Sequence, residues 1–123
     1  MSLIGACTCG SVQFELKKEP RWLVSCNCSA CRKLGTLWAH MNVQDVVLSG
    51  NASDTFCYTR GDGATIGFHS CILCGCTTHW EGLTPDNEDI IALNGRLLPP
   101  DTMKTFRIRE FDGADSWAFL DDE

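Results

Sequence analysis

The sequence predicts a mainly β protein of one domain, and three observations lead to this prediction. A chain of 123 residues has room for one domain of ordinary size, so we expect residues 1–123 to form a single domain. Hydrophobic residues make up 44% of the chain and include four tryptophans, which indicates a folded core. Along most of the chain, apolar residues alternate with polar ones, as they do in strands with one buried face.

The alternating segments are short and are separated by turn residues. Val12, Phe14 and Leu16 mark the first such segment. Further strands are expected at residues 22–26, 37–43, 56–58, 66–68, 77–80, 90–93 and 103–109, the last with Phe106 and Ile108 on one side. The glycine-rich residues 60–63 predict a hairpin turn. Short strands with tight turns favour an antiparallel arrangement.

Only one short helix is expected, at residues 29–35. Ser29 is a residue type that caps helix starts, and Gly35 is one that ends helices. Residues 97–101 contain two consecutive prolines, which are not accepted within a central strand, so we expect a turn or loop there.

Charge and hydropathy exclude several classes of protein. The formal net charge is −6 and no basic footprint is visible, so we expect no nucleic-acid partner. No apolar run approaches the roughly 20 residues of a membrane-spanning helix. Residues 1–5 lack the basic start and apolar stretch of a secretory signal, so we expect a cytoplasmic location. The acidic end, Asp121 to Glu123, is expected to be a solvated tail.

Nine cysteines are the most informative feature of the composition. An odd number disfavours a complete set of disulfides, and in a reducing compartment cysteine clusters more often bind metal. Seven of them fall into three groups, which predict two zinc ions per chain. The groups are Cys7 and Cys9; Cys26, Cys28 and Cys31; and Cys71 and Cys74.

The first and last groups predict a structural zinc site. Each is a closely spaced pair followed directly by glycine, which lets the backbone fold tightly around a metal. Structural zinc is usually held by four ligands in a tetrahedron, often all thiolates. The expected ligands are Cys7, Cys9, Cys71 and Cys74. Such a site would tie the first strand to one far along the chain.

The middle group predicts a catalytic zinc site. Cys26, Cys28 and Cys31 supply three thiolates, and three protein ligands leave one coordination position open. The expected helix start favours the thiolate form. Arg32 and Lys33 help to offset the negative charge. Binding of a substrate carboxylate is an alternative role for them, but exposure to solvent is the role that we expect. Iron–sulfur ligation or a redox role remains an alternative, but no fourth clustered cysteine completes such a site.

The remaining cysteines and the histidines are expected to play supporting parts. Cys57 is expected to be a small buried hydrophobic residue, and Cys76 a core residue or a neighbour of the metal site. His40, His69 and His79 form no metalloprotease motif and are expected to be hydrogen-bonded strand residues. His79 lies nearest to the third cysteine group and is the best placed of the three to contact the metal site.

Together, the motifs at residues 5–12, 26–35, 68–75 and 111–117 resemble the glutathione-dependent formaldehyde-activating enzyme family, which includes the domain of centromere protein V. The resemblance implies a β-rich fold of the Mss4-like type. It also implies a structural zinc on the first and third cysteine motifs and a catalytic zinc on the second. The activity implied is addition of glutathione to formaldehyde, giving S-hydroxymethylglutathione, by a carbon–sulfur lyase. Many members of the family have histidine where this chain has Asn27, so the resemblance gives no support for an acid–base role at that position.

Two functions are compatible with these motifs. One is an enzyme whose second zinc binds a small thiol such as glutathione, lowers its pKa and promotes attack on an aldehyde. The other is a non-enzymatic zinc module for protein interaction or metal buffering. The module predicts a fourth protein ligand at the second site, from Cys76, Cys57 or a histidine.

Overall fold

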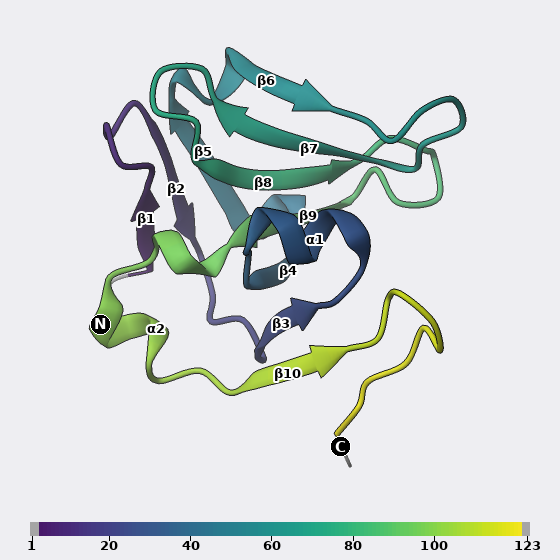
Figure 1. Cartoon of the computed structure of the whole chain (residues 1–123). Helices are drawn as coiled ribbons and strands as arrows, with labels where there is room; N and C mark the ends of the chain where they lie inside the picture. Colours follow the sequence, from purple (N-terminus) through teal and green to yellow (C-terminus); the bar gives the residue numbers. More distant parts are fainter. Residues whose placement is uncertain (1–2, 122–123) are drawn as a thin grey trace.

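The computed structural model describes residues 3–121, which form a mainly β domain of two sheets with two short helices (Figure 1). The strands are β1 Ile4–Ala6, β2 Val12–Leu16, β3 Leu23–Cys26, β4 Trp38–Asn42, β5 Val46–Gly50, β6 Thr55–Tyr58, β7 Ile66–Cys71, β8 Thr77–Gly82, β9 Ile90–Asn94 and β10 Ile108–Phe111. The helices are α1 Ser29–Leu34 and α2 Pro100–Met103. The smaller sheet has the order β1-β2-β5, and the larger has the order β10-β3-β4-β9-β8-β7-β6.

The main hydrophobic core lies where the smaller sheet packs on one face of the larger. In β2, buried and exposed residues alternate, and Phe14 and Leu16 point into this core. From the larger sheet, Ala39, Met41 and Leu93 meet them. Burying one large aliphatic or aromatic side chain contributes about 1.5–3 kcal/mol. This core therefore provides much of the stability that holds the two sheets together.

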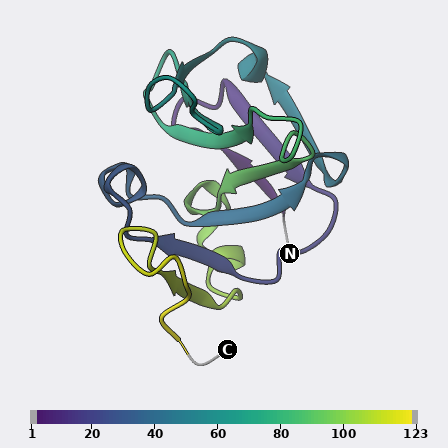
Figure 2. The ribbon, with the colours of Figure 1, turned by 90° about the vertical axis from the view of Figure 1, so that its right-hand side faces the viewer.

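A second core covers the opposite face of the larger sheet. Trp38 lies one residue before Ala39 and so points to the other side of β4. There it packs with Val24, Cys31, Phe68 and Ala92. The helix α1 and the C-terminal segment lie on this side (Figure 2). The two faces of one sheet thus have separate coverings, and only one of them includes α1, the helix that carries Cys31.

The short helix is confirmed at residues 29–34, and Gly35 ends it in the left-handed conformation with φ of 68°. Its start differs from the expectation in one respect. The N-cap is Cys28 rather than Ser29, because the Cys28 sulfur accepts a hydrogen bond from the backbone N–H of Cys31. The cap of α1 is therefore also one of the clustered cysteines.

Several expectations from the sequence are wrong in detail. A loop was expected at residues 97–101, but the helix α2 begins at Pro100. Proline is favoured in the first turn of a helix. The strand expected at residues 103–109 begins only at Ile108, which is exposed. The pattern also missed β1 and β5. Finally, β10 pairs with β3 in parallel, so the larger sheet is not purely antiparallel.

The C-terminal segment is fastened to the domain, which corrects the expectation of a solvated tail at Asp121. Arg109 is buried, with its guanidinium 4.4 Å from the Trp22 ring and 3.7 Å from the Phe119 ring. The carboxylate of Asp121 accepts hydrogen bonds from Arg109 at 2.7–3.1 Å. Residues 122 and 123 of the expected tail lie outside the described residues. Within residues 3–121, no helix has the length and apolar character needed to cross a membrane.

Candidate metal centres

The structure brings the first and last cysteine groups together. The sulfur atoms of Cys7, Cys9, Cys71 and Cys74 all lie within 4.8 Å of one another. The Cys9 sulfur lies 3.7 Å from the sulfurs of both Cys7 and Cys71. A tetrahedral zinc with bonds of about 2.3 Å to sulfur requires sulfur separations of about 3.8 Å. The cysteines are free rather than disulfide-bonded, and their spacing fits a metal ion.

Two turns that both end in a left-handed glycine present these four sulfurs. In each, the glycine that follows the second cysteine has φ of 79°, a region that favours glycine. Gly10 N–H donates to the Cys7 carbonyl and Gly75 N–H donates to the Cys71 carbonyl, both at 2.9 Å. One turn joins β1 to β2 and the other joins β7 to β8, so the cluster links the two sheets.

Hydrogen-bond donors around the first cluster favour thiolates. Backbone N–H groups of Val12 and Leu73 point to the sulfurs of Cys7 and Cys71 at 3.3 and 3.4 Å. The Ser11 hydroxyl lies 3.1 Å from the Cys71 sulfur, and its hydrogen bond is the main cause that lowers the pKa of Cys71 to about 6. Ser11 was not identified from the sequence, because only the folded turn brings it to a sulfur more than 50 residues away.

The two remaining cysteines have different environments. Cys76 packs against the first cluster, and its sulfur lies 3.4 Å from the backbone nitrogen of Thr8 and 3.1 Å from the Thr8 hydroxyl. Cys76 was expected to be either a core residue or a neighbour of the metal site, and the structure places it beside the candidate ligands. Cys57 is exposed on the edge strand β6, so the expectation that it is buried is wrong. Cysteine is often a small buried residue, but β6 has a neighbouring strand on one side only.

The second cluster consists of Cys26, Cys28 and Cys31, whose sulfur atoms also lie within 4.8 Å of one another. Cys26 is the last residue of β3, Cys28 caps α1, and Cys31 lies in the first turn of that helix. Burial is the main cause that raises the pKa of Cys26 and Cys31. Burial also acts to raise the pKa of Cys28, but hydrogen bonding, led by the Cys31 N–H, outweighs it and lowers that pKa.

Two groups close off the second cluster on two sides. On the side of the core, the indole N–H of Trp38 donates to the Cys31 sulfur at 3.3 Å. On the side of the C-terminal segment, Gly113 lies so close that a Cβ atom placed on it would be 2.7 Å from the Cys26 sulfur. Neither contact was evident from the sequence: Trp38 lies only seven positions from Cys31 but reaches it from the next strand, β4, and Gly113 lies far along the chain.

Asn27 fastens the C-terminal segment over this cluster. Its side-chain amide donates to Asp112 and accepts from the backbone N–H of Ala114, each at 3.0 Å. Asp112 also accepts hydrogen bonds from the backbone and hydroxyl of Ser116. The hydrogen bond from Asn27 is the main cause that lowers the pKa of Asp112. Asn27 thus holds a loop rather than carrying a proton.

The histidines do not join either cluster. His69 and His79 stack on each other with ring centroids 4.4 Å apart. His69 also bonds to Thr55 and Glu81, and His79 to Thr78. Because side chains alternate along a strand, both rings point away from the face on which Phe68 packs with Cys31.

The expected contact between His79 and a metal site is therefore not found; burial and His69 lower its pKa to about 4. His40 packs edge-on against Trp80. Within residues 3–121, the group of three cysteines gains no fourth ligand from a histidine, another cysteine or an acidic residue.

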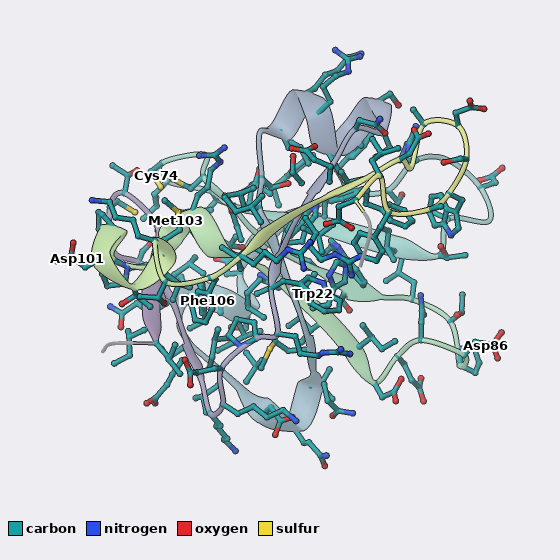
Figure 3. All side chains as sticks on the ribbon, turned by 90° about the horizontal axis from the view of Figure 1, so that it is seen from below. Trp22, Cys74, Asp86, Asp101, Met103 and Phe106 are labelled. Carbon is teal, nitrogen blue, oxygen red and sulfur yellow. The ribbon has the colours of Figure 1, made fainter. Side chains whose placement is uncertain are left out.

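The two clusters lie on different sides of the molecule. In Figure 1 the β1–β2 and β7–β8 turns are on the left, whereas the connection from β3 to α1 is on the right. Figure 3, which views the molecule from below, labels Cys74 among other sulfur atoms on one side and Trp22, which packs against the second hydrophobic core, nearer the centre. The two candidate metal centres are thus separate.

Comparisons with known proteins agree with the resemblance given by the motifs. Residues 2–107 match the family described as glutathione-dependent formaldehyde-activating enzyme. The match ends before β10, so the resemblance at residues 111–117 lies outside it. A crystal structure of a Rhodobacter sphaeroides protein is 25% identical, has a TM-score of 0.67, and is aligned over 85% of this chain and 98% of its own. No curated protein matches the chain significantly in sequence.

Proposed function

The chain belongs to the glutathione-dependent formaldehyde-activating enzyme family, and on that premise we propose that it is a zinc-dependent enzyme that joins a small thiol to an aldehyde. The specific reaction proposed is addition of glutathione to formaldehyde, the direction opposite to carbon–sulfur cleavage. In this addition the sulfur bonds to the carbonyl carbon, and the carbonyl oxygen takes up the proton that the thiol loses. The reaction is balanced without an oxidant or reductant.

The observation that carries this proposal is the group of three cysteines at the start of α1. Three closely spaced sulfurs fit zinc, which prefers tetrahedral coordination by sulfur and nitrogen. Three ligands leave one position for an exogenous group. A zinc ion bound there would lower the pKa of a coordinated thiol and thereby supply a nucleophile at neutral pH.

The protein's own residues prepare this position. The Trp38 indole fixes the Cys31 sulfur from the core side by its hydrogen bond. The loop that Asn27 holds covers the Cys26 side and limits the access of water there. Such neighbours of metal ligands orient them and typically change metal affinity or activity 10–100-fold when removed.

The first cluster is proposed to hold a structural zinc. Its four sulfurs satisfy a tetrahedral ion without an external ligand, and they come from turns in both sheets. A non-enzymatic zinc module required a fourth protein ligand at the second cluster from Cys76, Cys57 or a histidine. Cys76 lies at the first cluster, Cys57 is exposed, and the two stacked histidines bond elsewhere, so none of these residues supports that alternative.

The proposal is tested by replacing zinc with cobalt, whose thiolate complexes absorb visible light. Titration with glutathione should shift the spectrum, because its free sulfur enters the open position, whereas S-methylglutathione should leave it unchanged. Cys28→Ser should lose the response, and Cys57→Ser, an exposed cysteine outside both clusters, should keep it. If neither thiol alters the cobalt spectrum and adduct formation is no faster than in buffer, the enzyme proposal is wrong.

A further inference from the structure

Two sides of the second cluster are covered by other parts of the chain, and the start of α1 is exposed. Trp38 covers Cys31 from the core, and Gly113 covers Cys26 from the C-terminal segment. Cys28 is half-buried, and the residue after it, Ser29, is exposed. The start of α1 is therefore a place where a small thiol can reach the cluster.

Arg60 stands at this side of the cluster. It belongs to the connection between β6 and β7, and its guanidinium Nη2 donates to the Ser29 hydroxyl at 2.6 Å. In Figure 2 this connection lies above α1, and the C-terminal loop lies below the helix. The contact joins residues 31 positions apart and places a cation beside the residue that follows Cys28.

The charge of Arg60 is not neutralised within the described residues. Arg107 and Arg109 both bond to Asp121, whereas no carboxylate of residues 3–121 lies within ion-pair distance of Arg60. A guanidinium has five N–H donors in a planar fork, of which one is engaged by Ser29. The remaining donors suit the two oxygens of a carboxylate.

Electrostatics favours a local cation at this place. The chain has a formal net charge of −6, and three thiolates around a divalent ion add negative charge at the site. An anionic thiol would therefore be repelled unless a positive group met it locally. Arg32 and Lys33, which are exposed on α1, add to the positive charge near the cluster.

We propose that Arg60 forms a carboxylate-binding subsite beside the second cluster and selects thiols that carry a carboxylate over neutral ones. This inference rests on the proposed function, because it requires that a thiol binds at the cluster. It assigns to Arg60 recognition of the substrate's acidic group rather than contact with the reacting sulfur.

The test compares glutathione with its diethyl ester, which keeps the thiol but has no free carboxylate. Binding to metal-loaded protein is followed by calorimetry and by the cobalt spectrum. The intact protein should bind glutathione about tenfold more tightly than the ester, and added salt should reduce this preference. Arg60→Gln should weaken glutathione binding about tenfold and leave ester binding unchanged, while Arg60→Lys should retain part of the preference.

Arg96→Gln serves as the matched control, since Arg96 is an exposed arginine in the 3-10 turn Gly95–Leu97 and should have no effect. If Arg60→Gln leaves the preference for glutathione over the ester intact, or weakens the binding of both equally, the proposed subsite is wrong while the enzyme proposal stands. Equal binding of glutathione and ester by the intact protein also overturns the subsite alone. If the intact protein binds neither thiol, the enzyme proposal fails and the subsite fails with it.

Discussion

The two cysteine clusters differ in what they connect. The first joins residues as far apart as Cys9 and Cys71, 62 positions along the chain, and it links the smaller sheet to the larger. The second lies entirely within residues 26–31, between the end of β3 and the first turn of α1. A metal in the first cluster closes a long loop, whereas a metal in the second closes almost none. Similar ligands therefore have different effects on stability according to their separation in sequence.

The two clusters also differ in the groups that surround their sulfur atoms. The first is enclosed by two glycine turns whose backbone N–H groups point to its sulfurs. The second is covered by the Trp38 side chain from the next strand and by a loop near the C-terminal end of the chain, and it has one sulfur fewer. The first arrangement suits a closed structural ion, and the second suits an ion that exchanges a ligand.

The largest expected effect separates the clusters by stability. Cys74→Ser should remove a ligand that holds the two sheets together. Because binding of a structural zinc contributes directly to folding, the variant should melt at least about 15 °C lower or lose its cooperative transition. Cys28→Ser should melt within about 5 °C of the unaltered protein. Thermal unfolding followed by circular dichroism provides the comparison.

Equal and severe loss of stability in both variants would contradict this distinction, since it would make the second cluster structural as well. Cys57→Ser is the matched control, because Cys57 is an exposed cysteine outside both clusters. Its melting temperature should stay close to that of the unaltered protein.

A smaller effect is expected from the covering loop. Gly113→Ala would place a methyl group against the Cys26 sulfur, so the loop or the sulfur must move. We expect the affinity of the second metal to fall about tenfold, as is typical for changes next to metal ligands, with no change at the first site. Competition with a chelator measures both affinities. Ala114→Ser, an exposed neighbour, should leave both unchanged; equal weakening of both sites by Gly113→Ala would contradict the account.

Local pattern was enough to predict most strands, the helix α1 and both cysteine sets. Alternation revealed β2, and pairs of cysteines followed by glycine revealed the first cluster, because these signals lie within a few residues. The family comparison confirms the resemblance on which the expected activity rests. The predicted metal roles themselves stay predictions.

Features that depend on tertiary contacts were not predictable in this way. Ser11, Trp38, Gly113 and Arg60 reach their cysteine clusters only through sheet packing or loop contacts. The exposure of Cys57 depends on β6 being an edge strand, which sequence alternation does not reveal.

The parallel pairing of β10 and the burial of Arg109 likewise depend on where the chain returns after α2. Asn27 was expected only to lack an acid–base role. Its function as a clamp became visible once Asp112 and Ala114 lay beside it.

The most direct test of the difference between the clusters is release of zinc followed together with secondary structure. Freshly purified protein should contain about two zinc ions per chain. A chelator should remove one quickly with no change in circular dichroism, and the other slowly as the protein unfolds. A single zinc ion, iron in place of zinc, or loss of both ions in one step with unfolding would contradict the account.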